Sequence, residues 1–243
     1  MLSSPLLSLT IPLLNEQDGV TSLTEALVAT LRHAQIPTQL ILVDNGSSDL
    51  TRARIEALQP SHPEVELLHL PHNQGYGGGI LAGMACARAP FLGFLWGDEQ
   101  VPHYAVLRCL ERLRAGTCDV AKARRVVRLE GWQRKLVTRT YHTLFPLFFD
   151  CPSDDLHGCP KLFTRNAWEQ IHAQSRDWFI DAEIMLRTQR LGLRLEEIPV
   201  VSWPRATGRS KVRGSTLLEF AQNVARHRLL SPHLRAARPG QGS

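Results

Sequence analysis

Short runs of hydrophobic residues alternate with amphipathic segments over the first half of the chain. The runs have the length of buried strands and cover residues 6–14, 39–43, 65–70 and 91–95. Between the first two, apolar residues recur at helical spacing, namely Val20, Leu23, Leu27 and Leu31. Further helices are predicted up to residue 58, after the glycine-rich loop 73–79 through residue 87, and over 102–113. Strands that alternate with helices predict βαβ units and a largely parallel sheet.

The regular alternation stops after Val120. Aromatic and basic residues mix over 132–149, and a polar loop reaches Cys159. The remaining segments predict a short strand, two helices, a strand and a last helix, over 161–163, 166–173, 179–190, 193–201 and 217–230. Pro199 places the 193–201 strand at an edge or a strand end, because proline has no amide hydrogen to donate.

We therefore expect one α/β domain over residues 1–230. Its nucleotide-binding half would cover about 1–120 and its acceptor-binding half about 121–230, with a basic, disordered tail over 231–243. The composition, with 43% hydrophobic and 21% charged residues, is typical of a globular protein. No apolar run approaches the roughly 20 residues that span a bilayer, and no signal peptide is recognised. Five cysteines without a Cys-x-x-Cys pair favour a reducing compartment over disulfides or zinc, so a cytoplasmic location is expected.

Positive charge collects late in the chain, whose formal net charge is +5. Such a bias suits a phosphate-bearing partner or an anionic membrane surface. For the last residues, the better interpretation is that the charges simply face solvent. The aromatic stretch 132–149 could lie on the inner face of a membrane or cradle a prenyl chain. The alternative, a helix packed on the sheet, better accounts for most of its apolar residues. We expect peripheral membrane contact at most, no nucleic-acid partner, and leave the oligomeric state open.

Polar residues follow the predicted strands where a ligand would bind. Ligands of open α/β sheets bind outside the carboxyl ends of the strands, and Glu16, Asp44 and Asp98 stand there. A carboxylate at that edge can hold a divalent cation, which in turn can hold a diphosphate. Each has a structural alternative: Asp98 as a helix cap, Asp44 as a turn residue, and Glu16 as a charge favoured by a helix N-terminus. Asp49 is predicted to be a structural cap.

Residues 8 to 213 contain a series of short motifs that follow one another in the same order as in a known enzyme family. They are Pro12-Leu13-Leu14-Asn15-Glu16; Val43-Asp44-Asn45-Gly46-Ser47-Ser48-Asp49; Asn73 with Gly75 and Gly77; Trp96-Gly97-Asp98-Glu99-Gln100; Asp155 with Lys161-Leu162-Phe163; Phe179-Ile180-Asp181-Ala182-Glu183; Glu197-Ile198-Pro199-Val200; and Arg205-Ala206-Thr207-Gly208-Arg209-Ser210-Lys211. Together they resemble the family-2 glycosyltransferases with a GT-A fold, nearest to the dolichyl- and polyprenyl-phosphate sugar synthases.

The resemblance implies an inverting transferase that moves a sugar from a nucleotide-diphosphate sugar to a lipid phosphate, with Mg²⁺ or Mn²⁺. It implies nucleotide-sugar contacts from Pro12, Asn15, Glu16, Asp44, Asn73 and Asp98. The implied catalytic residues are Asp98, Asp155 and Asp181, and the implied metal ligands are Asp98 and Gln100. The implied acceptor-phosphate residues are Arg125, Arg134, Arg209 and Lys211; arginine binds phosphate bidentately and lysine as a point charge.

Two residues depart from the family pattern. Asn45 replaces an Asp of the nucleotide turn and can still accept a hydrogen bond. Trp96 replaces the first Asp of an Asp-x-Asp pair, and an indole has no oxygen to give to a metal ion. Glu99 and Asp181 are then further candidates for the missing ligand. Three outcomes follow from Trp96: a weaker metal site, a metal-independent mechanism, or an inactive relative.

Two other functions stay open. The chain could act on a soluble saccharide or natural-product hydroxyl, with Asp181 as the general base. It could also be a non-catalytic module that binds nucleotide sugar or lipid phosphate. The glycines at 75–79 lack the Lys-Ser/Thr of a phosphate loop, and structural flexibility or close packing is predicted for them instead. Asp181 and Glu183 are expected on different helix faces, and His157 and His172 are interpreted as ordinary surface residues.

Overall fold

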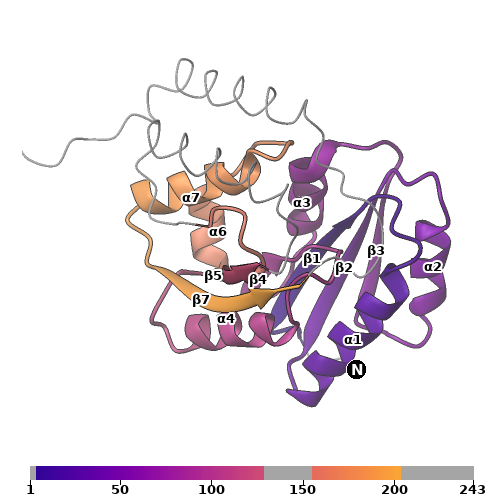
Figure 1. Ribbon diagram of the computed structural model, residues 1–243, viewed down its shortest axis with the longest axis horizontal. Coiled ribbons are helices and arrows are strands. Elements are labelled where there is room, and N and C mark those ends of the chain that lie inside the picture. The colour runs from indigo at the N-terminus through magenta and orange to yellow at the C-terminus, as the bar shows by residue number, and fades with distance from the viewer. Residues whose placement is uncertain (1–3, 129–154, 204–243) are drawn as a thin grey trace, which may run out of the picture.

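The computed structural model describes residues 4–128 and 155–203, which form one sheet between two layers of helices (Figure 1). The sheet order is β3-β2-β1-β4-β6-β5-β7. The strands are β1 (Leu7–Leu13), β2 (Thr38–Asn45), β3 (Val65–Leu70), β4 (Phe91–Phe94), β5 (Val120–Arg128), β6 (Lys161–Thr164) and β7 (Leu195–Ser202). The helices are α1 (Val20–His33), α2 (Thr51–Leu58), α3 (Gly75–Ala85), α4 (Tyr104–Arg114), α6 (Arg165–Ile171) and α7 (Ile180–Arg190).

Strand β1 lies between β2 and β4 and is parallel to both. The chain moves from β1 outward to β2 and β3, then returns to the other side of β1 as β4. The segments that follow β1 and β4 lead to α1 and α4, and both helices lie on the same face of the sheet. A pocket is lined there by Leu23 of α1 and by residues of the loop after β4. Strand β6 is antiparallel to β4 and β5, whereas β5 and β7 are parallel, so the prediction of a largely parallel sheet is confirmed.

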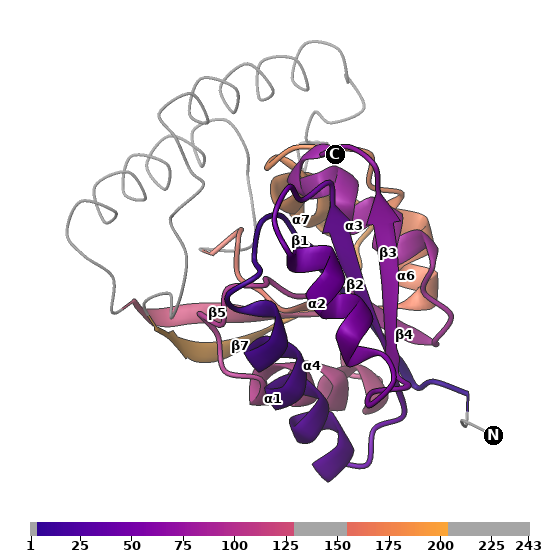
Figure 2. The same cartoon turned by 90° about the vertical axis from the view of Figure 1, so that its right-hand side faces the viewer.

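Each face of the sheet carries its own hydrophobic core. On one face, Leu27 of α1 and Leu110 of α4 pack against the strands; on the other, Ile80 of α3 and Ile184 of α7 do so. Figures 1 and 2 show α1 and α4 on one side of the sheet and α3, α6 and α7 on the other. Helices therefore cover both faces of the sheet.

Strand β5 was missed by the hydrophobic pattern, which stopped at Val120. The strand carries Lys122, Arg124 and Arg125, and these charges hid its period. Lys122 is nevertheless fully buried, because Glu197 on the neighbouring strand β7 pairs with it at 2.8 Å. The predicted edge position of the Pro199 strand is confirmed, since β7 ends the sheet.

The helix after β3 begins earlier than predicted. Helix α3 begins at Gly75, so the glycines predicted as a loop belong to the helix. Among the described residues, no helix combines the length and apolar character that crossing a bilayer requires. The four cysteines that the structure describes are free. The stretches 132–149 and 217–230, and the tail 231–243, lie outside the described residues.

Candidate active site

The carboxyl ends of β1, β2 and β4 carry the acidic residues of the candidate site. Glu16 follows β1, Asp44 lies near the end of β2, and Asp98 follows β4. Asp98 is half-buried and lines a narrow pocket together with Trp96 and Gln100. Its Oδ1 accepts a hydrogen bond from the backbone amide of Gln100 at 3.3 Å. The segment after β4 thus places a carboxylate at the carboxyl edge of the parallel strands, beside a narrow pocket.

Asn15 and Glu16 form the rim where β1 ends. The Asn15 carboxamide oxygen accepts from the Ser48 amide at 2.8 Å, and the Asn15 amide donates to the Ser47 hydroxyl. Glu16 donates its own amide to Thr51 at 2.8 Å. These bonds tie the ends of β1 and β2 together, while Asn15 stays exposed and Glu16 half-buried. Pro12, also half-buried, lies on β1 itself.

Asp44 is fully buried, with a partner for each oxygen. Its Oδ2 lies 2.8 Å from Nδ1 of His69, the neighbouring residue on β3, and its Oδ1 accepts from the Ser47 amide. Asp44 therefore shapes the turn as well as occupying the predicted nucleotide position. Asp49 accepts from the amide and hydroxyl of Thr51 at the start of α2. It is therefore structural as predicted, but the N-cap residue of the helix is Leu50.

Asn45 braces the entrance of α3. Its side-chain nitrogen donates to the Gly75 carbonyl at 2.9 Å, and its oxygen accepts from the Gln74 amide at 2.9 Å. Asn73, exposed at the loop, accepts from the Gly75 amide with its own Oδ1. An aspartate at position 45 could accept but not donate, so the departure from the family pattern has a structural reason.

The α3 glycines allow close contact with the segment before α7. A Cβ on Gly75 would lie 2.3 Å from the Arg176 carbonyl oxygen, and one on Gly77 would lie 2.2 Å from that of Ser175. The Gly78 amide donates to the same Arg176 carbonyl at 2.9 Å. Of the two predicted roles, flexibility and close packing, these contacts bear out close packing.

Trp96 occupies the position of the missing metal-ligand aspartate and has partners of its own. Its indole nitrogen donates to the Tyr76 hydroxyl at 2.8 Å, and the Arg125 guanidinium lies 4.9 Å from the centre of its ring. Tyr76 in turn stacks on Trp178 with ring centres 4.3 Å apart. Loss of solvent around the Tyr76 hydroxyl, followed by the negative charges of Asp181 and more weakly Asp98, raises the pKa of Tyr76.

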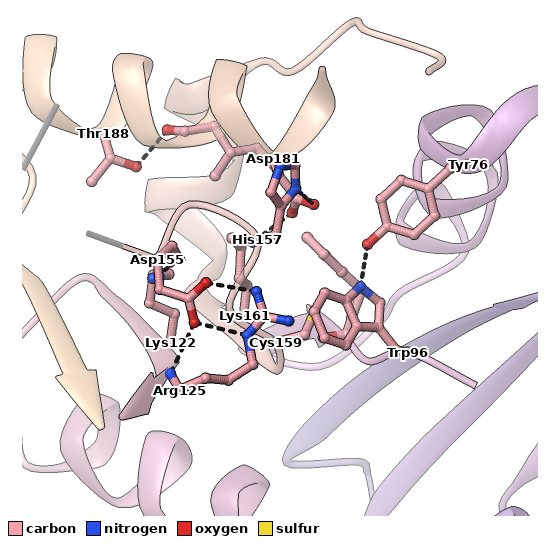
Figure 3. A network of polar contacts seen from close by, with 12 residues as sticks. Tyr76, Trp96, Lys122, Arg125, Asp155, His157, Cys159, Lys161, Asp181 and Thr188 are labelled. Carbon is pink, nitrogen blue, oxygen red and sulfur yellow. Dashed lines mark hydrogen bonds and ion pairs between the residues drawn. The ribbon is translucent and has the colours of Figure 1, made fainter. Parts of the chain in front are cut away.

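Arg125 and Asp155, predicted separately, form one buried ion pair. Two guanidinium nitrogens donate to the two carboxylate oxygens at 2.9 and 2.6 Å, and the Arg125 amide donates a third bond. Burial alone would raise the pKa of Asp155, but the hydrogen bonds and charge of Arg125, with the charge of Lys122, hold it well below its ordinary value. Lys122 also donates to the Asp155 carbonyl at 2.6 Å. Figure 3 shows this pair beside Trp96.

Asp181 lies at the start of α7 and has no exposed surface. Lys161, equally buried, binds its Oδ1, and His157 Nδ1 lies 3.1 Å from its Oδ2. Burial favours a raised pKa, but the charge of Lys161 and the bond and charge of His157 reverse the effect and lower the pKa of Asp181. Glu183 instead accepts from the Gln174 and Ser175 amides, so the expected separation of the two carboxylates is confirmed.

The interpretation of His157 as an ordinary surface residue was wrong. Its side chain is 29% exposed and contacts a fully buried carboxylate. Sequence reasoning also passed over Tyr76, Lys122 and His69. Spacing gave no signal for these residues, because their hydrogen-bond partners lie 20 or more positions away along the chain.

Few side chains near the candidate site are placed to bind a metal ion. Among the described residues, no group of three or more His, Cys, Asp or Glu side chains is placed to hold a metal ion. Glu99 accepts from Ser22 at 2.8 Å, and Asp181 is enclosed by its partners. Asp98 and Glu99 both line the pocket, and Gln100 is buried next to them. One carboxylate fits Mg²⁺ or Mn²⁺ that takes its other ligands from substrate phosphates and water. Arg134, Arg209 and Lys211 lie outside the described residues.

Known proteins of similar sequence are glycosyltransferases. Glycosyltransferase AglD of Haloferax volcanii is 28% identical over 89% of this chain, and dolichyl-phosphate beta-glucosyltransferase ALG5A of Trichomonas vaginalis is 26% identical over 91%. The chain spans 35% of the length of the first and 72% of the second. Among solved structures, glucosyl-3-phosphoglycerate synthase from Mycobacterium tuberculosis, in complex with Mn²⁺, UDP-glucose and phosphoglyceric acid, matches 98% of this chain and 84% of its own. The TM-score is 0.70 at 18% identity, which indicates a shared fold.

The family model described as glycosyl transferase family 2 matches residues 8–171, which include β1 to β6 and the candidate site up to Lys161. The seven-stranded sheet, the carboxylates at its carboxyl edge and these similarities agree. The chain therefore belongs to glycosyl transferase family 2, the glycosyltransferases with a GT-A fold.

Proposed function

We propose that this protein transfers a hexose from a nucleotide-diphosphate sugar to a polyprenyl- or dolichyl-phosphate acceptor, with inversion at the anomeric carbon. The observation that carries the proposal is the set of carboxylates at the carboxyl ends of three neighbouring parallel strands: Glu16 after β1, Asp44 in β2 and Asp98 after β4. Family membership supports the donor class, and the name of ALG5A, of which the chain spans 72%, supports the lipid phosphate. The expected location is the cytoplasmic face of a membrane.

The donor would lie across the carboxyl ends of the parallel strands. Exposed Asn15 and half-buried Glu16 can accept from base and ribose groups, next to the turn that Asp44 organises. Asp98 would hold a divalent cation together with the diphosphate. Such a cation, when bound, offsets the charge of the diphosphate and makes the nucleoside diphosphate a better leaving group. The solved structure of glucosyl-3-phosphoglycerate synthase is a complex with UDP-glucose and Mn²⁺, which makes this pair the first to test.

A phosphate acceptor needs little proton transfer. The second ionisation of a phosphate monoester has a pKa near 6, so an oxygen able to attack is already ionised at neutral pH. Attack from the side opposite the diphosphate inverts the anomeric centre. The protein would mainly position the two substrates and exclude water, which agrees with a site built from buried ion pairs.

The test is a thermal-shift panel of UDP-, GDP- and dTDP-sugars with and without Mn²⁺, because a ligand that binds only the folded state raises the melting temperature. One donor should raise it in wild type, and the shift should shrink in Asp98→Ala. That donor should then release its nucleoside diphosphate only when a prenyl phosphate is added. Equal donor turnover in wild type and Asp98→Ala, or no shift with any donor, would contradict the proposed function.

A further inference from the structure

Glu99, which follows Asp98 in the loop after β4, has a backbone conformation that its residue type disfavours. Its φ is +53°, in the left-handed region, where a residue with a Cβ meets a steric cost. Among the other described non-glycine residues with positive φ, Gln35 and His172 come just after the last turns of α1 and α6, where this conformation commonly ends a helix. Asn15 is of a type that tolerates it. Glu99 ends no helix, so a contact outside its own turn must hold it there.

The Glu99 side chain is tied to helix α1. The Ser22 hydroxyl donates to Glu99 Oε1 at 2.8 Å and also lies 3.0 Å from the carbonyl oxygen of Gly19, at the start of the same helix. A hydroxyl has a single proton to donate, and a carboxylate is the stronger of the two acceptors. If Glu99 moved away, the hydroxyl could turn to the Gly19 carbonyl. Release of Glu99 would therefore leave Ser22 with a partner.

Gln100, the next residue, buries a donor that has no partner. The residue is 4% exposed, and its Nε2 makes no hydrogen bond to any part of the chain that the structure describes. Its backbone, in contrast, is held on both sides: the amide donates to Asp98 Oδ1 at 3.3 Å, and the carbonyl accepts from the Trp203 amide at 2.9 Å. An unpaired buried donor is unfavourable. Because the backbone is held, the carboxamide can reach a partner by rotating its own side chain.

These features lie together at the pocket beside the candidate site, which Asp98, Glu99 and Gln100 all line. Two neighbouring residues carry an energetic cost in this conformation, and the bond to Ser22 offsets part of it. Strain of this kind is common in ligand clamps and in segments with two conformations. A ligand favours the conformation that it binds better, and a phosphate oxygen close to Asp98 would give the Gln100 amide an acceptor.

We propose that residues 98–100 form a turn with two conformations, and that the hydrogen bond between Ser22 and Glu99 holds the one seen in this structure. Donor binding releases Glu99 from α1 and turns the Gln100 carboxamide out of the pocket, where Nε2 donates to an oxygen of the diphosphate. Ser22 touches no substrate and is a positioning residue that acts through Glu99. The inference rests on the proposed binding of a nucleotide-diphosphate sugar at Asp98.

The experiment compares wild type with Ser22→Ala and with a matched control, Thr30→Ala, which also removes a hydroxyl that donates to a backbone carbonyl of α1. The Kd for UDP-glucose in the presence of Mn²⁺ is measured by titration calorimetry. The apparent Kd is higher when more of the protein is held in a conformation that binds poorly, so Ser22→Ala should bind about fivefold more tightly. Thr30→Ala should bind as wild type does. Unchanged or weaker binding in Ser22→Ala overturns the proposal, because loss of a merely structural bond would not improve binding.

Gln100→Leu tests the unpaired donor. Leucine fills a similar space without a buried amide, so the melting temperature without nucleotide should rise, whereas UDP-glucose should bind about tenfold more weakly. A lower melting temperature would show that the amide already stabilises the fold, and it would overturn the proposed rotation.

Hydrogen exchange without nucleotide separates this inference from the proposed function. The Gln100 amide, which is bonded within the turn, should exchange about fivefold faster in Ser22→Ala than in wild type, because local opening becomes easier. The Leu95 amide, bonded to the Thr10 carbonyl on β1, should exchange at the same rate in both. Equal exchange at Gln100 overturns the two-conformation turn. Failure of UDP-, GDP- and dTDP-sugars to bind wild type overturns the proposed function instead.

Discussion

Single residues explain the two departures from the family pattern. Asn45 is needed as a donor to the Gly75 carbonyl, and Trp96 is held between Tyr76 and Arg125. Each replacement removes a carboxylate and adds a contact that a carboxylate cannot make. Each position therefore loses a negative charge and gains contacts with α3 or β5. Substitution back to aspartate restores the charge and removes the contacts, so it tests which of the two matters.

Asn45→Asp should lower the free energy of unfolding by about 1–3 kcal/mol. The change removes two donated hydrogen bonds and places a buried carboxylate against the Gly75 and Asn73 oxygens. Urea unfolding followed by circular dichroism measures the effect. Asn166→Asp, exposed in the first turn of α6, adds the same charge and serves as the control. Equal free energies of unfolding in the two variants would show that the hydrogen bonds of Asn45 do not stabilise the fold.

Trp96→Asp should strengthen metal binding while weakening the fold. A second carboxylate beside Asp98 adds an oxygen ligand, so the Mn²⁺ concentration needed for half of the donor-dependent thermal shift should fall about tenfold. The melting temperature without ligands should also fall, because the contacts with Tyr76 and Arg125 are lost. Trp96→Phe keeps a ring beneath Arg125 but loses the indole donor, so its Mn²⁺ requirement should not change. An unchanged requirement in Trp96→Asp would place the metal elsewhere.

Among the elements, α3 depends on glycine to approach the segment before α7. Gly75 has a φ of +81° and lies against the Arg176 backbone, whereas Gly116 has a φ of +69° with open space around its Cα. Comparing alanine substitutions at Gly75 and Gly116 therefore separates the cost of backbone strain, which both share, from the cost of a steric clash, which only Gly75 has. It also tests whether α3 and the α7 segment form one unit, as the bond between the Gly78 amide and the Arg176 carbonyl indicates.

Gly116→Ala should cost about 1–2 kcal/mol, the price of a left-handed conformation for a residue with a Cβ. Gly75→Ala should cost about 2 kcal/mol more, because the new methyl meets a carbonyl oxygen as well. Chemical unfolding of both variants gives the difference. Gly75→Ala should in addition shrink the donor-dependent thermal shift, since Tyr76 is the next residue. Equal costs for the two variants would contradict the close packing.

At the scale of the whole molecule, ion pairs with at least one buried partner join the elements of the second half of the fold. Asp155 pairs with Arg125, Glu197 with Lys122, and Asp181 with Lys161. They connect the loop before β6, strand β5, strand β7 and helix α7. Breaking one such pair leaves an uncompensated buried charge, which is far more costly than losing a surface pair. Their protonation therefore affects the stability of the whole fold.

Acid should destabilise the protein mainly through Asp155 and Asp181. Both have a pKa below the ordinary value of about 3.9, so their contribution is complete above that value and is lost as the pH falls towards their folded pKa values. The free energy of unfolding should decline progressively below about pH 5. Asp155→Asn should be less stable at neutral pH and should depend less steeply on acid. Asp18→Asn, exposed near the start of α1, should follow the wild-type curve; a parallel slope in all three would exclude the ion pairs as the cause.

The order of strands and helices in the first half was predictable from sequence, because each element there carries its own periodicity. Strand β5 was not, since its lysine and arginines become buried only by pairing with β7 and the loop before β6. The candidate site likewise combines residues that could be predicted from the sequence with pairings that could not. Asp98 could be placed from the end of an apolar run, but Arg125 and Asp155 could not be recognised as partners.

The linear sequence determined the alternating α/β order, the acidic residues at the strand ends and the family, because these depend on short-range patterns and local turn chemistry. Only the folded chain decided which charges neutralise one another, why Trp96 and Asn45 are suited to their positions, and that His157 rather than Asp181 reaches solvent. The reason is that burial and pairing of polar groups depend on residues far apart in the chain, and no local pattern records which of them will meet.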